Sequence, residues 1–285
     1  MEQNVRTFRL GAATVTALKF AHLQIVPATA LVCPDEERPL LDTPAFHEPV
    51  IVPAQCFHIA LPDTTILVDA GVFDANEDPG AVIPGYQPPA GLLEVMAQAG
   101  LRPDAVEHVV ITHGHWDHVN GSTEERDGRR VPIFPNARHY VGRGDWEAAV
   151  PLMDEPGSLA NRTLAVLARY GLLELVDDTE DLCGAARVVP TPGETPGHQV
   201  LRLVTEGQVS YYLGDLYHLA LEVEHPTWMP NWIYDRELKL RSRRDIAAAA
   251  AKNTALLFAA HIPSAGRLRP AGEGYAWEPA WPIWE

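Results

Sequence analysis

One strand–helix–strand pattern occurs twice in the chain at a nearly constant spacing. An apolar strand ending in Asp69 is followed by a helix and by a strand ending at His113, 44 residues later. The same order leads from a strand ending in Asp215 to one ending at His261, 46 residues later. Strands joined through a helix lie parallel in one sheet, with their carboxyl ends at one edge. The repetition therefore predicts an α/β fold of two similar halves, a four-layer αβ/βα sandwich whose strand ends converge.

The remaining segments fit that architecture within a single domain spanning 1–285. Apolar, partly β-branched stretches predict strands over 8–18, 57–61, 65–69, 108–112, 137–141, 172–176, 186–190, 200–204, 209–213 and 255–260. Helical spacing predicts helices over 91–100, 158–170 and 235–252, and Glu206-Gly207 predicts a hairpin turn. The Pro-rich stretch 27–53 is interpreted as a long ordered loop or lid, because a loop of that size in a compact domain usually has a function.

Charge and cysteine content narrow the class of protein. The chain has 38 acidic and 22 basic residues and a formal net charge of −16, which repels phosphate backbones and anionic lipids, so we expect no nucleic-acid or membrane partner. Cys33, Cys56 and Cys183 are too few and too widely spaced for a disulfide framework or a CxxC metal site. The start, residues 1–6, leads into no apolar core of a secretory signal, and the longest apolar run, 246–251, is far too short to span a bilayer. These features predict a cytoplasmic location.

The segment 113–118 carries the chemistry. It reads His-Gly-His-Trp-Asp-His and directly follows a predicted strand. His113 and His115 point to one side because alternate residues of an extended chain face the same way, and Asp117 and His118 come from the following turn. Gly114 allows the backbone to turn tightly. Four imidazole and carboxylate groups at this spacing can give two adjacent metal ions two ligands each.

This motif resembles the signature of the metallo-β-lactamase-fold superfamily. The segment 191–198, Thr-Pro-Gly-Glu-Thr-Pro-Gly-His, resembles its TPGHTPGH segment with Glu194 in place of the first histidine. Gly214-Asp215 resembles its bridging aspartate and Ala260-His261 its last histidine, so the matches run from about 69 to 261. The resemblance implies one metal held by His113, His115 and His198, a second held by Asp117, His118 and His261, and Asp215 as the bridge between them.

The implied ligands indicate a type of reaction. Two divalent ions, with zinc as the leading candidate and manganese, iron or cobalt as alternatives, suit imidazole and carboxylate donors. Such a pair makes a bridging water a hydroxide near neutral pH and polarises a carbonyl or phosphoryl oxygen. We therefore expect a metal-dependent hydrolase that attacks a hydrophobic lactone, carboxylic ester or organophosphate ester. Asp117 and Asp215 are its catalytic carboxylates in this interpretation.

Three further residues stand next to these ligands. Asp69 lies in a turn that resembles the superfamily's Asp-x-Gly turn and would orient the metal-binding loop, although a strand-end Asp can also simply form an Asx-turn. Lactonases of the superfamily have a Tyr three residues after the bridging aspartate, where this chain has His218, with Tyr217 one position earlier. Either could assist the leaving group. Segments 214–218, 134–137 and 274–277 resemble the methyl-parathion-hydrolase-like and lactonase or esterase branch.

Aromatic residues suggest a pocket for a hydrophobic substrate. The candidates are Trp116, inside the metal motif, Trp228 and Trp232, and the turn with Phe20 and His22. Trp228 and Trp232 could instead pack in the core or across a dimer. The family resemblance implies a homodimer.

Three other functions remain open at this stage. A glyoxalase-II-like thioesterase has the same ligand types, but no basic anchor for glutathione is evident near the C-terminus. A persulfide-dioxygenase-like enzyme would bind one iron through His113, His198 and Asp215. A non-catalytic, metal-stabilised binding module would need only a closed set of four ligands.

Overall fold

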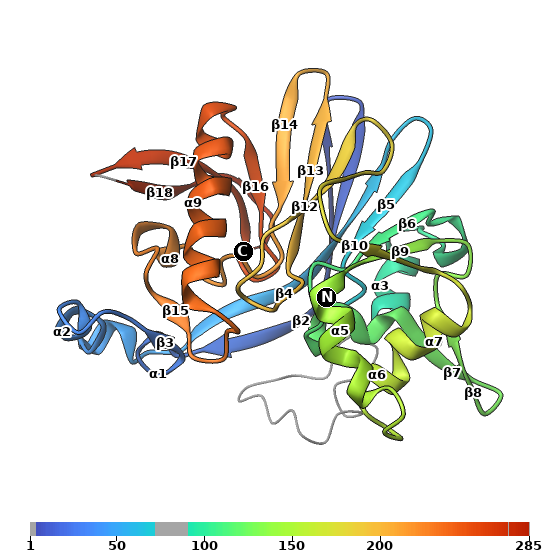
Figure 1. Cartoon of the computed structure of the whole chain (residues 1–285). Coiled ribbons are helices and arrows are strands. Elements are labelled where there is room, and N and C mark those ends of the chain that lie inside the picture. The colour runs from blue at the N-terminus through green and yellow to red at the C-terminus, as the bar shows by residue number, and fades with distance from the viewer. Residues whose placement is uncertain (1–3, 72–90, 273, 285) are drawn as a thin grey trace.

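Two large sheets face each other in the computed structural model of the chain (Figure 1), which describes residues 4–71, 91–272 and 274–284. Among these residues each large sheet has seven strands. The first has the order β1 (Val5–Leu10), β2 (Ala13–Ile25), β4 (Val50–Ala60), β5 (Thr65–Val68), β6 (His108–Val110), β9 (Arg138–Gly142), β10 (Leu173–Val176). The second has the order β11 (Glu180–Asp181), β12 (Ala186–Pro190), β13 (Gln199–Thr205), β14 (Gln208–Tyr212), β16 (Leu256–Phe258), β17 (Ser264–Ala271), β18 (Gly274–Pro282).

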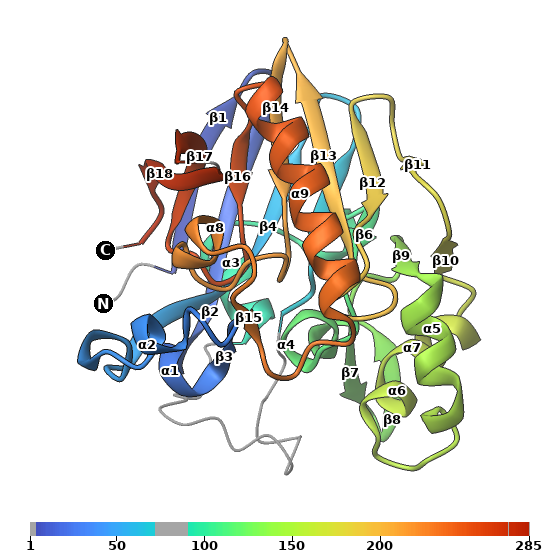
Figure 2. The same cartoon turned by 60° about the vertical axis from the view of Figure 1, so that its left-hand side comes forward.

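Three apolar clusters divide the molecule into layers. The cluster between the sheets includes Phe57 of the first sheet, whose ring lies 5.4 Å from that of Phe258 in the second. A second cluster joins the outer face of the first sheet to α3 (Leu92–Gln98) and α7 (Leu164–Arg169). The third joins the outer face of the second sheet to α9 (Arg236–Lys252), which Figure 2 shows lying across β13 and β14. The predicted four-layer αβ/βα sandwich is confirmed.

The repeated strand–helix–strand pattern is the frame of both halves. β5 and β6 are parallel neighbours joined through α3, and β14 and β16 are parallel neighbours joined through α9. Asp69 follows β5, and Asp215 follows β14. The predicted hairpin turn is also present: Glu206 and Gly207 both have positive φ between β13 and β14. The strand ends therefore meet where the two sheets face each other.

Two helices begin at polar residues whose side chains cap them. The Asp235 side chain accepts a hydrogen bond from the Leu238 amide at the start of α9, 2.9 Å long. Ser158 accepts from the Asn161 amide at the start of α6 (Leu159–Arg162). The single helix predicted over 158–170 is wrong, because Thr163 leaves helical geometry with φ −119° and ψ −85° and separates α6 from α7.

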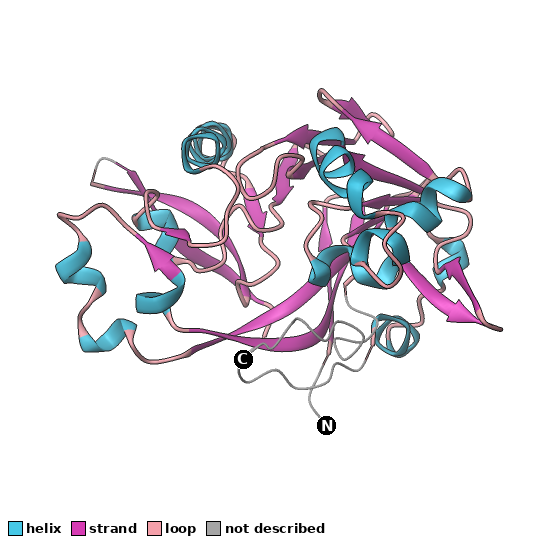
Figure 3. Cartoon of the chain, turned by 60° about the horizontal axis from the view of Figure 1, so that its bottom comes forward, coloured by secondary structure: helices cyan, strands magenta, loops and turns pink. Residues whose placement is uncertain are grey.

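The Pro-rich stretch is only partly a loop. Residues 27–49, called the arm below, contain α1 (Pro27–Ala30), β3 (Leu31–Val32), α2 (Arg38–Leu41) and the 3-10 helix η1 (Pro44–Phe46), while 50–53 already belong to β4. Each of these helices has Pro in its first two positions, where the missing amide costs no hydrogen bond. β3 pairs with β15 (Met229–Pro230), so the arm packs against the segment after α8 (Leu221–Glu224), as Figure 3 shows from below.

Several other segments differ from the prediction. The strand predicted over 8–18 is the β1–β2 hairpin, which turns at Gly11 with φ +56°, where a Cβ would meet the Thr205 carbonyl oxygen at 2.7 Å. Sequence reasoning missed the hairpin of β7 (Thr123–Arg126) and β8 (Arg129–Pro132), the strands β17 and β18, and the helix α5 (Arg143–Ala149). No helix in the described part of the chain is long and apolar enough to cross a membrane.

Candidate metal centre

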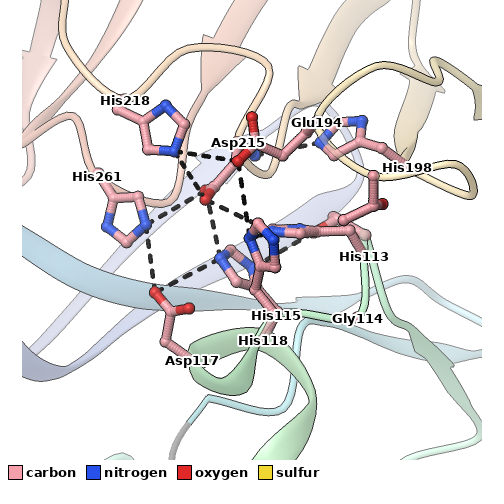
Figure 4. Close-up of polar contacts among 12 residues, drawn as sticks. His113, Gly114, His115, Asp117, His118, Glu194, His198, Asp215, His218 and His261 are labelled. Atoms are coloured by element: carbon pink, nitrogen blue, oxygen red, sulfur yellow. Dashed lines mark hydrogen bonds and ion pairs between the residues drawn. The ribbon is translucent and has the colours of Figure 1, made fainter. Parts of the chain in front are cut away.

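Polar side chains from four separate segments meet at the junction of the two sheets (Figure 4). His113 follows β6. His115, Asp117 and His118 lie at the start of the short helix α4 (Trp116–Val119). His198 directly precedes β13, Asp215 follows β14 and His261 follows β16. The structure therefore brings together all seven predicted metal ligands: His113, His115, Asp117, His118, His198, Asp215 and His261.

One group of donors surrounds His113. Its Nε2 lies 2.8 Å from His115 Nδ1 and 3.5 Å from Asp215 Oδ2. Together with Glu194, these residues offer donor atoms that all lie within 4.8 Å of one another, a set able to hold one cation. This set is called the first cluster.

A second group consists of Asp117, His118 and His261, whose donor atoms also lie within 4.8 Å of one another. This set is called the second cluster. Asp117 Oδ2 is 3.3 Å from His261 Nε2 and 3.6 Å from His118 Nε2. Asp215 Oδ1 faces the same two nitrogens at 3.2 and 3.3 Å, while its Oδ2 faces the first cluster. One carboxylate thus presents one oxygen to each cluster, as a bridging aspartate must.

His198 borders the first cluster. Its ring centre lies 5.3 Å from that of His113, and its Nε2 accepts a hydrogen bond from the Asp215 amide at 3.3 Å. On the other side of the ring, Nδ1 contacts the hydroxyl and the carbonyl of Thr191 at 2.9 and 3.1 Å. Thr191 therefore fixes the ring with Nε2 directed toward the backbone of Asp215, at the border of the first cluster.

The charge distribution fits bound cations. His118 Nε2 and Asp215 Oδ1 are buried and have no hydrogen-bond partner among the described residues. Burial lowers the pKa of His261, but the carboxylates of Asp215 and Asp117 outweigh this effect and raise it to about 10. Burial, followed by the neighbouring imidazoles of His118 and His115, lowers the pKa of His113 well below its usual range. In the absence of metal, protons on some imidazoles must balance the carboxylates, a role that divalent cations can take over.

Asp69 supports this centre from behind. Its Oδ1 accepts from the Thr112 amide at 2.7 Å, and its Oδ2 lies 3.0 Å from the Thr112 hydroxyl and 2.8 Å from His118 Nδ1. These partners are 43 and 49 residues away, so the side chain does not form the alternative Asx-turn. Because it engages Nδ1, Asp69 directs Nε2 of His118 toward the cluster, which is the orienting position expected for it.

Asp145 is a buried carboxylate that sequence reasoning missed. It lies in α5 and accepts hydrogen bonds from the Gly114 amide at 2.7 Å, the Gly197 amide at 2.7 Å and the Thr195 hydroxyl at 2.8 Å. α5 approaches residue 197 so closely that a Cβ on Gly197 would lie 2.4 Å from the Asp145 amide nitrogen. Asp145 therefore joins the loop that carries His113 and His115 to the loop that carries Glu194 and His198. No sequence motif surrounds it, and only the tertiary contacts reveal it.

A cavity of about 450 Å³ opens onto both clusters. Trp116 and Trp232, two of the predicted pocket residues, line it together with Leu23, Gln24 and Ile25 from the end of β2. The remaining lining residues are His115, Asp117, Asp215, His218 and His261. Four of the seven predicted ligands, His115, Asp117, Asp215 and His261, thus face an accessible, partly apolar space.

Three predicted pocket residues lie elsewhere. Trp228 is fully buried, its indole N–H donates to Glu37 of the arm, and its ring stacks on His225 with centres 4.1 Å apart. Phe20 is buried with its ring against Gly71, and β2 reaches the cavity only beyond His22, with its last three residues. Trp228 thus follows the core-packing alternative, because the arm covers it.

The structure places Tyr217 and His218 in different environments. Tyr217 is buried in the apolar cluster under α9, with the Arg243 guanidinium 4.8 Å from its ring centre, so its assignment as a catalytic residue is wrong. His218 instead lines the cavity with Nε2 3.0 Å from Asp215 Oδ2. The Glu222 carboxylate accepts from the amides of His218 and Leu219, both at 2.8 Å, and is itself paired with Arg243. These bonds hold the backbone that follows Asp215 in place.

Glu194 is the departure from the expected TPGHTPGH segment, and it lies in the first cluster. Its Oε1 is 3.6 Å from His115 Nδ1. Its Oε2 pairs with Lys239 of α9, which is as deeply buried as Glu194. The sequence signal for Glu194 was its position within the 191–198 motif, whereas no sequence motif indicated Lys239.

Comparison with protein families identifies the group to which the chain belongs. The sequence profile described as "Metallo-beta-lactamase superfamily" matches residues 51–261, nearly three quarters of the chain. The chain belongs to the metallo-β-lactamase superfamily. This membership agrees with the resemblance noted in the sequence and with the four-layer architecture.

Curated relatives of this superfamily member are N-acyl homoserine lactonases. The AiiA enzyme of Bacillus thuringiensis subsp. kurstaki is 24% identical over 221 residues, which cover 74% of this chain and 81% of the relative. The enzyme of Bacillus cereus is 22% identical over 222 residues with the same coverage.

Solved structures confirm the metallo-β-lactamase fold. AidC, described as a dizinc quorum-quenching lactonase, aligns with a TM-score of 0.77 at 19% identity over 97% of both chains. The hydrolase AbOPH aligns with a TM-score of 0.74 at 23% identity over 98% of both chains. Family membership, relatives and donor clusters together support a metal-dependent hydrolase as the enzyme class.

Proposed function

We propose that the protein is a dinuclear metal-dependent lactonase that opens the ring of a lactone with a hydrophobic substituent, an N-acyl homoserine lactone being the first candidate. The observation that carries this proposal is the position of Asp215, with one oxygen toward each cluster. A closed structural site would need four ligands and no bridging carboxylate. The curated relatives are lactonases by name, which supports the lactone over other esters.

The metal assignment combines the two clusters with His198, which borders the first cluster. His113, His115 and His198 would hold one ion, Asp117, His118 and His261 the other, and Asp215 both. Zinc is the leading candidate, since AidC is described as dizinc and imidazole and carboxylate donors suit zinc. When bound, two such ions ionise water near neutral pH and polarise a carbonyl oxygen.

Side chains around the cavity provide for binding and for the leaving group. Trp116, Trp232, Leu23 and Ile25 offer apolar surface to an acyl substituent. When the ring C–O bond of the lactone breaks, the leaving oxygen must gain a proton to become the hydroxyl of the product. His218 Nε2 lies on the cavity wall beside Asp215, where it can hold that proton. His218 thus stands where related lactonases have a tyrosine.

The test is turnover by metal-loaded protein of three substrate types: an N-acyl homoserine lactone, an aryl ester and a phosphotriester. Ring opening releases a proton, which a pH indicator reports. We expect the lactone to be turned over fastest, and Asp215→Asn to lose one metal equivalent and most activity. A ranking led by the aryl ester or the phosphotriester would refute the lactone assignment.

Metal analysis separates the competing enzymes. Two ions per chain are expected here, whereas a persulfide-dioxygenase-like enzyme would contain one iron. A glyoxalase-II-like thioesterase would turn over glutathione thioesters, which this protein should leave intact. Absence of any hydrolysis by protein with both ions bound would favour the binding module.

We further propose a homodimer formed through the arm, and a cytoplasmic location. The arm and the adjoining strand end expose large apolar side chains, with Ile51 62% and Leu40 47% exposed. Light scattering should give twice the mass of one chain, and Ile51→Glu should shift it toward one. The location rests on the three cysteines, which are unpaired. Cell fractionation tests it.

A further inference from the structure

A buried ion pair forms part of the wall of the first cluster. Glu194 and Lys239 are 2% and 0% exposed. The Lys239 ammonium donates to Glu194 Oε2 and also to the carbonyl oxygen of Asp215, at 2.9 Å. The other carboxylate oxygen, Oε1, accepts from the Trp232 indole N–H at 3.1 Å. Both oxygens of Glu194 are therefore held in place from outside the cluster.

The backbone around Glu194 is equally constrained. The amides of Tyr234 and Asp235 donate to the carbonyls of Glu194 and Gly193, at 2.9 and 3.0 Å. Gly193 has φ +138°, and a Cβ there would lie 2.2 Å from the Lys239 amide nitrogen. Only glycine permits this close approach of α9. The first turns of α9 are thus fixed directly against the loop that carries Glu194.

Glu194 Oε1 lies at a distance from a first-cluster donor that suits a shared ion. It lies 3.6 Å from His115 Nδ1 and 3.7 Å from His218 Nε2. Two donors that bind one ion at 2.0–2.2 Å with a tetrahedral angle are about 3.4 Å apart. A carboxylate has about four acceptor positions. Donors from the described residues fill one on each oxygen of Glu194, which leaves a position on Oε1 available.

We propose that Glu194 is an additional metal-binding carboxylate of the first cluster, and that Lys239 offsets its charge. The inference rests on the proposed dinuclear centre and specifies the preference of one of its positions. Burying a lone carboxylate is costly, and the paired ammonium lets the chain place a third carboxylate in the centre without added net charge. Carboxylate oxygens are ligands that suit manganese, and an additional donor favours a metal ion with a higher coordination number. Glu194 therefore shifts the first position toward manganese and away from four-coordinate zinc.

The alternative is that the pair only braces the loop. The two roles differ in how the partners respond to substitution. If Glu194 binds metal, Lys239→Met keeps the donor and should preserve metal preference, while it destabilises the metal-free protein by leaving a buried carboxylate unpaired. If the pair is a brace, Glu194→Gln and Lys239→Met should have equal effects.

The experiment uses metal-free full-length protein titrated with cobalt(II), followed by visible absorption, and with manganese in competition with zinc. Cobalt(II) absorbs weakly when five- or six-coordinate and strongly when four-coordinate. We expect Glu194→Gln to intensify the absorption of the first-cluster ion and to weaken manganese binding relative to zinc by at least about tenfold, as ligand-shell changes typically do. Lys239→Met should retain the wild-type spectrum and the wild-type metal ratio.

Two further variants complete the design. Glu194→Gln/Lys239→Met replaces the pair with neutral side chains, so it should fold even if the single variants do not, and it should behave like Glu194→Gln. Glu222→Gln/Arg243→Met removes a comparably buried pair that carries no first-cluster donor. Because Glu222 also holds the amides of His218 and Leu219 in the Asp215 loop, this control should lower stability and overall metal affinity. It should keep the wild-type manganese-to-zinc ratio, because the set of donors is unchanged.

Two results would overturn the inference: a wild-type spectrum and metal ratio in Glu194→Gln/Lys239→Met, or equal shifts in Glu194→Gln and Lys239→Met. Neither readout depends on a substrate. A wild-type protein that binds metals as described and opens no lactone would instead refute the proposed function alone.

Discussion

Replacing Asp145 tests whether one carboxylate holds the two ligand loops together. Asp145 accepts three hydrogen bonds, and bonds to a charged acceptor contribute about 1.5–3 kcal/mol each. In Asp145→Asn the amide oxygen can keep the Gly114 and Thr195 donors, but the amide NH₂ then faces the Gly197 N–H. One bond is lost and a donor is left buried, so we expect the free energy of unfolding to fall by roughly 3 kcal/mol.

The assay is urea denaturation of the chelated protein, followed by metal titration. Thr195→Val is the matched control, because it removes one of the same hydrogen bonds without placing two N–H groups face to face. It should lower the free energy of unfolding by about 1 kcal/mol. Since the loops carry His113, His115 and His198, Asp145→Asn should also weaken metal binding by about 10- to 100-fold. If the stability and metal affinity of Asp145→Asn match those of Thr195→Val, Asp145 is not the clamp described here.

The remaining predictions concern pH and the cavity. Burial lowers the pKa of His139 to about 4, so its contribution to stability is present above about pH 6.5 and is lost as the pH falls through 4. The free energy of unfolding of His139→Leu should therefore fall by about 3 kcal/mol less on acidification than that of the wild type. Equal dependence of the two unfolding free energies on pH would contradict this. The pKa of His261 is raised to about 10 in the metal-free protein, so metal binding at pH 8 must release its proton. Calorimetry in two buffers of different ionisation enthalpy should give different observed enthalpies of metal binding. Identical binding enthalpies in the two buffers would exclude the proton release. The raised pKa also means that this part of metal-free stability is present below about pH 6.5 and declines toward pH 10, which denaturation at pH 6 and pH 9 measures. Trp232→Ala should raise KM for long-chain lactones by roughly tenfold, as expected for the loss of an aromatic contact, while Trp232→Phe should keep most of the affinity. A change in KM that does not depend on acyl chain length would count against an acyl-binding role for Trp232.

Local patterns predicted the elements that depend on neighbours in sequence. The predicted helix starts at residues 158 and 235 are confirmed, because each start is fixed by a capping side chain that needs only the backbone amide three residues on. The spacing of Asp69, His113, Asp215 and His261 predicted the two parallel crossovers, since a strand–helix–strand unit is itself local. Local reading failed where the partner is remote, as in the arm, whose short helices and strand β3 form against 221–230.

The sequence by itself determined which donors the metal centre contains, because imidazoles and carboxylates at motif spacing have little other use together. Only the tertiary structure decided which neighbours join them. Adjacent Tyr217 and His218 point into different environments, one under α9 and one into the cavity. Asp145 and Lys239 reach the centre through packing of α5 and α9 at glycines 142, 193 and 197. Such contacts depend on where whole elements dock, and no local pattern of residues encodes that docking.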